Sequence, residues 1–226
     1  MKKRKKTRKI KIKKVITFLV LILIIILFVL WYKDKKITNI YVTGNNLVSE
    51  QMVLELSELD DYPLIYKVSN GKIRKRLLTS PFIEYVSVKK SLLGKVTINI
   101  QEYEVLCKDS VNNQYVLSNG NRISYDDNLI GIPSVVNEVK EEVYQKFVEA
   151  LKSIDSNIVY KISEIIYDPN GLDDERFLLY MTDQNYVYIT LDKIEVINTY
   201  NEIVPTLEGK KGILYLDSGN HFEIKK

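Results

Sequence analysis

The sequence contains one cysteine and one histidine among its 226 residues. Because a disulfide needs two thiols, Cys107 cannot form one within the chain. The fold must therefore be held together by its core and not by disulfides. Cys107 also has no second cysteine or histidine nearby to complete a zinc site. We therefore expect no metal ion and no cofactor, and we interpret Cys107 as a small, largely buried apolar residue.

The lone histidine, His221, lies within four residues of Asp217 and Ser218, and these are the residue types of a hydrolytic triad. Triad members normally converge from separated parts of a fold, and the nucleophile often sits in a G-x-S-x-G turn, which this chain lacks. Along a strand, Asp217 and Ser218 would point to opposite faces. We therefore predict no catalytic residue and interpret His221 as a surface residue.

The acidic segment DPNGLDDE, residues 168–175, suggests a calcium-binding loop. An EF-hand loop needs an oxygen ligand at its fifth position and a glycine at its sixth. Here Leu172 occupies the fifth position and Gly171 the fourth. We interpret the segment as a solvated acidic turn and predict no calcium site.

Charged residues are absent from residues 15–32, VITFLVLILIIILFVLWY. At ~1.5 Å per residue this stretch reaches roughly 27 Å as a helix, close to the hydrocarbon thickness of a bilayer. A signal peptide is the alternative, but its apolar part is only about 7–15 residues long and a small-residue cleavage site follows it. Trp31 and Tyr32 instead suit the aromatic belt at a membrane interface. We predict an uncleaved transmembrane helix over residues 15–32.

Acidic residues are absent from residues 1–14, which carry ten lysines and arginines. The positive-inside rule places this basic tail in the cytoplasm and the rest of the chain outside, as in a single-pass type II membrane protein of the cell membrane. Such a tail also binds anionic lipid. Since the whole chain has a formal net charge of +4, the remainder carries about −6. The basic isoelectric point therefore gives no reason to expect a nucleic-acid partner.

Residues 37–104 show the order strand, helix, helix, strand, strand. Ser49 is a suitable N-cap for the first helix. Alternating apolar residues in 82–90 and 95–102 predict two strands joined by a hairpin. Because alternation implies one buried face, we expect two helices to cover one side of a three-stranded sheet. The expected core residues are Met52, Val53, Leu56, Leu59, Ile73, Leu77, Val86, Val88, Val96, Ile98 and Ile100.

The second helix of this region carries four basic residues, Lys72, Arg74, Lys75 and Arg76. They form either a solvated helix face or a contact with anionic lipid headgroups or a partner. Contact with lipid headgroups is an alternative because the linker between the membrane span and this domain has about five residues and reaches at most ~18 Å. We therefore expect the first exported domain to lie low on the membrane surface.

Residues 105–226 combine further strands and helices. Asn119-Gly120 predicts a hairpin turn, and an amphipathic helix follows Pro133. Strands are expected at 161–168, 176–181 and 185–191, then a short helix around 193–204 that stops at Pro205, and a last strand over GILYLDSG, residues 212–219 or slightly beyond. The predicted fold class is α+β: a transmembrane helix, a β-α-α-β-β domain, and a mixed α/β domain with a largely antiparallel sheet.

The order of these segments resembles the FtsQ/DivIB family of bacterial cell-division proteins over nearly the full length. ITNIYVTGNNLVSEQMV, residues 37–53, matches the family's POTRA module at Ile40, Val42, Gly44, Asn45 and Ser49. LLTSPFIEYVSVKK and KVTINIQEYEVL resemble the end of that module at Glu102, and YVLSNGNRIS, GIPSV and GILYLDSGNHF resemble the family's β-domain. The family often has a proline shortly after the glutamate, where this chain has Tyr103-Glu104-Val105, so the interdomain join differs.

The resemblance implies a scaffold that is not an enzyme and has no small-molecule substrate. Its expected parts are a cytoplasmic tail (1–14), a transmembrane helix (15–32), a POTRA-like domain (37–104) and a β-domain (105–226). The implied partners are FtsB/DivIC-like and FtsL-like single-span division proteins at the septum. Through them the scaffold would help to stabilise and regulate the septal peptidoglycan synthase.

In this family the partner pairs with the edge of the last β-domain strand, beside the preceding helix. An open strand edge can accept another chain as an additional strand, because its N–H and C=O groups are unpaired. We expect Gly219 to allow the close approach of the partner chain. The residues predicted to bind it are Tyr200, Tyr215, Leu216, Ser218, Gly219 and Phe222.

Two other functions are alternatives. A different POTRA-bearing membrane protein, such as a translocation or secretion component, would carry further POTRA repeats. A membrane-anchored cell-wall hydrolase would depend on Ser218 and His221.

Overall fold

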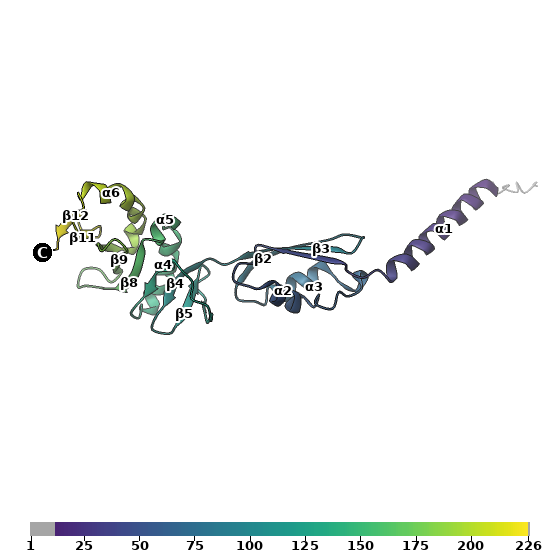
Figure 1. Ribbon diagram of the computed structural model, residues 1–226, viewed down its shortest axis with the longest axis horizontal. Coiled ribbons are helices and arrows are strands. Elements are labelled where there is room, and N and C mark those ends of the chain that lie inside the picture. Colours follow the sequence, from purple (N-terminus) through teal and green to yellow (C-terminus); the bar gives the residue numbers. More distant parts are fainter. Residues whose placement is uncertain (1–11, 226) are drawn as a thin grey trace, which may run out of the picture. The chain divides into compact units, whose positions relative to one another are not determined.

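The computed structural model describes residues 12–225, and its chain divides into two compact units between Glu102 and Tyr103 (Figure 1). Most of the predicted basic tail, residues 1–11, lies outside the described residues. Helix α1 (Ile12–Lys33) contains the charge-free stretch, and no residue in it is buried by the rest of the described chain. Its length and composition are sufficient to cross a membrane.

After α1, the first unit is built from three strands and three helical segments. Its sheet has the order β1-β3-β2, with β1 parallel and β2 antiparallel to β3. The sheet and both longer helices enclose one core, which includes Val53, Ile73 and Ile98. The elements are β1 (Asn39–Thr43), α2 (Glu50–Ser57), η1 (Ile65–Lys67), α3 (Asn70–Leu77), β2 (Ile83–Lys90) and β3 (Lys95–Glu102).

Local sequence explains how these elements begin and end. The Ser49 side chain accepts a hydrogen bond from the Met52 N–H and caps α2, as predicted. Met52 itself is 43% exposed, so its predicted place in the core is wrong, whereas Val53 is fully buried, as predicted. The Glu102 carboxylate accepts three N–H groups of the loop between β1 and α2, from Asn46, Leu47 and Val48. This residue therefore fixes the loop to the end of β3.

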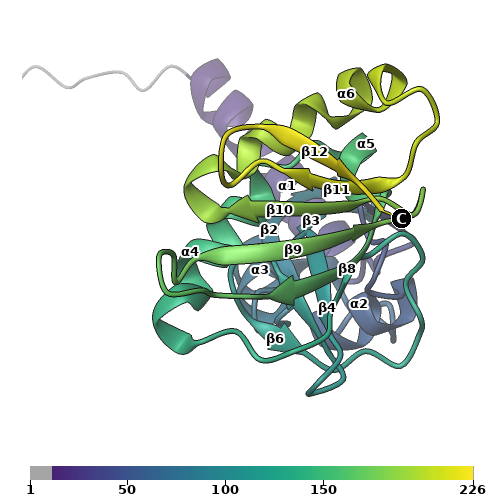
Figure 2. The same cartoon turned by 90° about the vertical axis from the view of Figure 1, so that its left-hand side faces the viewer.

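The second unit contains a nine-stranded sheet with the order β12-β11-β10-β9-β8-β7-β4-β5-β6. Most neighbours are antiparallel; β10 is parallel to β11, and β7 is parallel to β4 and β8. Figure 2 shows β8 to β12 side by side. The α+β fold class, with a largely antiparallel second sheet, is thus confirmed. The strands are β4 (Val105–Asp109), β5 (Gln114–Leu117), β6 (Arg122–Ile123), β7 (Ser134–Val135), β8 (Ile162–Tyr167), β9 (Arg176–Met181), β10 (Tyr186–Thr190), β11 (Gly212–Tyr215) and β12 (His221–Ile224).

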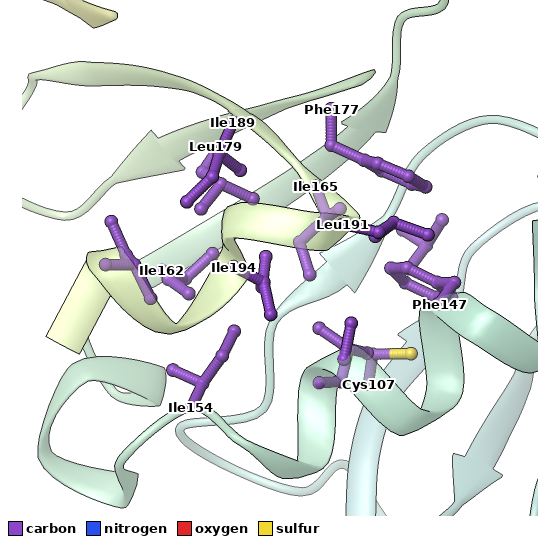
Figure 3. Packing of buried hydrophobic residues seen from close by; sticks show 14 of the residues in the cluster. Cys107, Phe147, Ile154, Ile162, Ile165, Phe177, Leu179, Ile189, Leu191 and Ile194 are labelled. Atoms are coloured by element: carbon purple, nitrogen blue, oxygen red, sulfur yellow. The ribbon is translucent and has the colours of Figure 1, made fainter. Parts of the chain in front are cut away.

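Helices cover the apolar face of this sheet. They are α4 (Glu141–Lys152), α5 (Ser156–Val159), η2 (Leu191–Thr199) and α6 (Tyr200–Thr206). Figure 3 shows side chains from α4, η2 and the strands meeting in the core, where the Phe147 and Phe177 rings stack with centroids 5.0 Å apart. The helix expected at 193–204 is a 3-10 segment followed by α6, and Pro205 lies inside α6 instead of ending it.

Cys107 belongs to the same core and has no exposed surface, as predicted. Burial, reinforced by the charge of Asp109, raises the pKa of its thiol far above the ordinary value. The neutral thiol acts as an apolar packing group.

Candidate functional site at the open edge of the second sheet

The last described segment of the chain forms a hairpin, so the predicted single strand over residues 212–219 is wrong. Strand β11 ends at Tyr215, and the chain reverses and pairs back on itself as β12. The reversal is explained by Gly219 and Asn220, whose φ angles are +84° and +50°. Two consecutive left-handed residues turn the backbone sharply, and glycine and asparagine tolerate that conformation best.

The hairpin moves the open edge of the sheet from β11 to β12. β11 is paired with β10 on one side and with β12 on the other. Among the residues that the structure describes, no strand pairs with the outer side of β12. The edge that could accept another chain is therefore residues 221–224.

The ladder register shows which backbone groups face outward. Ile224 lies opposite Gly212, and the Lys225 N–H donates to the Lys211 carbonyl at 3.0 Å. Because residues of an antiparallel strand alternate between bonding inward and pointing outward, His221 and Glu223 bond to β11. Phe222 and Ile224 direct their N–H and C=O groups to the open side.

The side chains of β12 differ on its two faces. Phe222 packs against the core cluster, whereas Ile224, two residues further on, is 54% exposed. On the other face the His221 ring stacks on Tyr215, with centroids 4.5 Å apart, and Tyr215 stacks in turn on Tyr188. The open edge is therefore flanked by an apolar side chain on one face and a row of aromatic rings on the other.

Close packing of β12 depends on Gly212, which the sequence reasoning missed. A Cβ added at this position would lie 2.0 Å from the Glu223 carbonyl oxygen, far inside contact distance. Gly219 has no atom within 4 Å of such a Cβ, so packing among the described residues does not require a glycine there, and its role in the approach of a partner chain stays a prediction. Gly219 is needed for the turn, and Gly212 for the approach of the two strands.

Two residues predicted to bind the partner lie in the core instead. Tyr200 and Leu216 are each 1% exposed. The Tyr200 hydroxyl donates to Asp183 at 2.9 Å and accepts from the Asn185 amide at 3.2 Å. The Asn185 side-chain oxygen accepts the Gly212 N–H, so this network joins α6 to the start of β11. Tyr200 and Leu216 can support the edge, but they cannot touch a partner without unpacking.

The turn between β11 and β12 is held by Asp217. Its carboxylate accepts a hydrogen bond from Arg176, whose guanidinium also pairs with Asp168 and lies 3.5 Å from the Tyr188 ring centroid. Burial opposes ionisation of Asp217, but the hydrogen bonds from Arg176 and Ser218 and the positive charge of Arg176 together outweigh it and lower the pKa of the carboxyl. Ser218 and Gly219 are therefore exposed on a turn whose base is fixed.

Comparison with known proteins agrees with this architecture. Residues 35–103 match the POTRA domain, FtsQ-type. The cell division protein DivIB of Bacillus subtilis is 29% identical over 223 residues, which cover 93% of this chain and 83% of that protein. The DivIB protein of Listeria monocytogenes is 28% identical, with 83% of this chain and 72% of that protein covered. The predicted resemblance to the FtsQ/DivIB family is confirmed.

A solved structure was also matched, the major extracytoplasmic domain of DivIB from Geobacillus stearothermophilus. It has 18% sequence identity and a TM-score of 0.41, and the match covers 48% of this chain and 96% of that one. The FtsQ/DivIB relatives are named as cell division proteins, and their names state no enzymatic activity. A role in cell division follows for this chain, and helix α1 fits a membrane-anchored protein.

The geometry of the DSGNH segment does not form a triad. The Ser218 hydroxyl donates to Asp217 at 2.9 Å, and the His221 Nδ1 lies 3.1 Å from the Ser218 backbone carbonyl. A general base must reach the nucleophile's hydroxyl, and here the hydroxyl is directed to the carboxylate instead.

The four basic residues of α3 do not act as one group. Arg76 pairs with Glu58 at 2.5 Å and donates to the Ser57 carbonyl, while Arg74 lies over the Tyr85 ring. Lys72 lines a hollow together with Arg76, and Lys75 does not. Lys72, Arg74 and Lys75 are exposed and Arg76 is half-buried, so the lipid or partner contact of these residues stays a prediction.

Proposed function

We propose that the protein is a bitopic scaffold of the cell-division complex that captures another single-span division protein by strand addition to β12. The basic tail would be cytoplasmic, α1 would cross the membrane, and residues 37–226 would be extracytoplasmic, with the protein at the division septum. The partner at β12 would be FtsB/DivIC-like, and an FtsL-like protein would complete the assembly. Through this assembly the scaffold would help to stabilise and regulate septal peptidoglycan synthesis.

The observation that supports this proposal is the outward-facing backbone of β12. Phe222 and Ile224 together offer two N–H and two C=O groups in line, and an extended segment can pair with them as a tenth strand. Backbone hydrogen bonds would supply affinity without regard to the partner's side chains. The edge is short, which limits self-association of the scaffold.

Side chains beside the edge would supply the specificity. Alternate residues of an added strand would lie near Ile224 on one face and near the rings of His221 and Tyr215 on the other. Tyr215 also donates to Glu223 at 3.2 Å, so a carboxylate is already present on that face. We expect the partner strand to place apolar residues on the Ile224 face and avoid an unpaired acidic residue beside Glu223.

Binding can be tested with the full chain in lipid nanodiscs and the extracytoplasmic segment of an FtsB/DivIC-like protein. Amide hydrogen exchange would be followed with and without the segment. The proposal predicts that the Phe222 and Ile224 amides become protected while the amides of β6, at the opposite edge, do not change. Binding without protection of these two amides would reject strand addition, and absence of binding would reject the choice of partner.

A further inference from the structure

A basic hollow of about 150 Å³ lies on the first unit, between the end of α2, the segment that contains Pro63, and α3. Its charged lining consists of Lys67, Lys72, Arg76 and Glu58. Glu58 is already paired with Arg76. Among the described residues, Lys67 and Lys72 have no ion-pair partner, so the hollow carries a net positive charge.

Two backbone hydrogen bonds connect the segment beside the hollow to the residues that directly follow α1. The Ile65 N–H donates to the Lys35 carbonyl at 2.9 Å, and the Ile37 N–H donates to the Pro63 carbonyl at 3.0 Å. Lys35 is two residues beyond Lys33, the last residue of α1. Two extended residues span at most ~7 Å, so the backbone of Ile65 lies within about 10 Å of the end of the helix. If α1 crosses the membrane, this segment is held at the level of the headgroups.

Exposed tyrosines flank the same segment. Tyr62 and Tyr66 are 44% and 51% exposed, while Ile65 between them is fully buried and anchors the segment to the core. Tyrosine is enriched at membrane interfaces because its ring is apolar and its hydroxyl is polar. Asp60 and Asp61 precede Tyr62 but do not line the hollow.

The distribution of charge along the chain also favours contact between the first unit and an anionic surface. Residues 33–102 contain eleven lysines and arginines and eight acidic residues, a net charge of +3. Residues 103–226 contain twelve basic and twenty-one acidic residues, a net charge of −9. An anionic surface would therefore attract the first unit and repel the second.

We propose that this hollow binds the phosphate of an anionic phospholipid headgroup in the membrane that holds α1, with Lys67 and Lys72 supplying the positive charge. Tyr62 and Tyr66 lie in the headgroup layer beside it. The contact fixes the first unit against the membrane, which the short linker alone does not do. The proposal is independent of strand addition at β12, because it concerns a different unit and a different ligand.

The test uses the full chain in nanodiscs with a fluorophore attached through Tyr66→Cys. Cys107 is fully buried, so the label goes to the introduced thiol. Headgroup spin-labelled lipid serves as the quencher, in discs of phosphatidylcholine alone and in discs that also contain phosphatidylglycerol. A further arm adds inorganic phosphate to the phosphatidylcholine discs. The test variant is the double charge reversal Lys67→Glu/Lys72→Glu. The control variant is Lys75→Glu/Lys89→Glu, which changes the net charge by the same amount at two lysines outside the hollow.

We expect strong quenching in the phosphatidylglycerol discs, with loss of most of it in Lys67→Glu/Lys72→Glu and on addition of salt. The Lys75→Glu/Lys89→Glu variant should keep most of the quenching. Equal quenching in both kinds of disc, or equal loss in both variants, would overturn the proposal. If inorganic phosphate changes the fluorescence on phosphatidylcholine discs as much as the anionic lipid does, the hollow is a general phosphate site and the assignment to lipid is wrong.

Discussion

The Nε atom of Arg176 donates a hydrogen bond to Oδ2 of Asp217 at 2.8 Å, and side-chain exposure is only 13% and 10%, respectively. Arg176 begins β9 and Asp217 belongs to the turn after β11. A second bond joins Lys193 of η2 to the Asp217 backbone carbonyl at 2.7 Å. The turn between β11 and β12 is thus hydrogen-bonded to β9 and to η2, and these bonds fix the position of β12.

Asp217→Asn should loosen the hairpin without unfolding the second unit. The substitution removes one of the two carboxylates that pair with the largely buried Arg176 guanidinium, and the Asp168 carboxylate remains. We therefore expect the stability of the hairpin to fall by about 1–2 kcal/mol. Amide exchange of β11 and β12 should become about 5–30 times faster, while exchange in β8 and β9 changes little. Ser218→Ala removes only the hydroxyl that donates to Asp217 and should have a smaller effect. Equal acceleration by both variants would contradict the role of the ion pair.

Stability of the hairpin should depend on pH through the same carboxyl. The pKa of Asp217 is lowered in the folded chain from its ordinary value of 3.8. The stabilisation is therefore fully present above pH 3.8 and is lost as the pH falls through the lower, folded-state pKa. Exchange rates of β12 corrected for intrinsic pH dependence should rise in this acidic range. Asp217→Asn should remove that rise, and an unchanged rise in the variant would assign it to another group.

The two glycines of the hairpin should respond differently to substitution. Gly212→Ala places a methyl group against the Glu223 carbonyl, so β12 must move away and partner binding should be lost. In Gly219→Asn the new side chain has no atom within 4 Å of its Cβ, and asparagine also tolerates a left-handed φ. Partner binding by this variant should therefore stay within about threefold of the unsubstituted chain. Affinity for the FtsB/DivIC-like segment measures both effects. Tight binding by Gly212→Ala would show that the position of β12 is unimportant.

Cys107 should resist alkylation in the folded chain. Its thiol is fully buried and its pKa is raised by burial, so little thiolate is present or accessible. Maleimide labelling should be slow at pH 8 and should become fast and complete in denaturant. Rapid labelling of the folded chain would contradict the packing of β4 against α4.

Sequence reasoning succeeded where local patterns decide the structure. The Ser49 cap, the alternation of Val96, Ile98 and Ile100, and the helix that carries Phe147 were predicted from signals only a few residues long. The sequence does not predict the hairpin at the end of the sheet, because Gly219-Asn220 can also be part of a continuing strand. The sequence does not predict the burial of Tyr200, because that burial depends on Asp183 and Asn185, which lie fifteen or more residues away. Such partners are determined by the tertiary fold.

The central claim is strand addition to β12, and a pair of substitutions at Ile224 tests it most directly. The Ile224 N–H faces the open side, so Ile224→Pro removes a donor for the added strand while leaving the β11 ladder bonds in place. Ile224→Ala removes the side chain and keeps that donor. Glu223→Pro, in contrast, removes an N–H that bonds to β11 and should disrupt the hairpin itself.

The decisive measurement is the affinity of full-length Ile224→Pro and Ile224→Ala for the FtsB/DivIC-like segment, with hairpin integrity checked by amide exchange of β11. Loss of a backbone hydrogen bond and the steric effect of the ring should weaken binding by Ile224→Pro at least about tenfold. Ile224→Ala should stay within about threefold of the unsubstituted chain. Equal affinities for the two variants, with intact hairpins, would contradict strand addition at this edge.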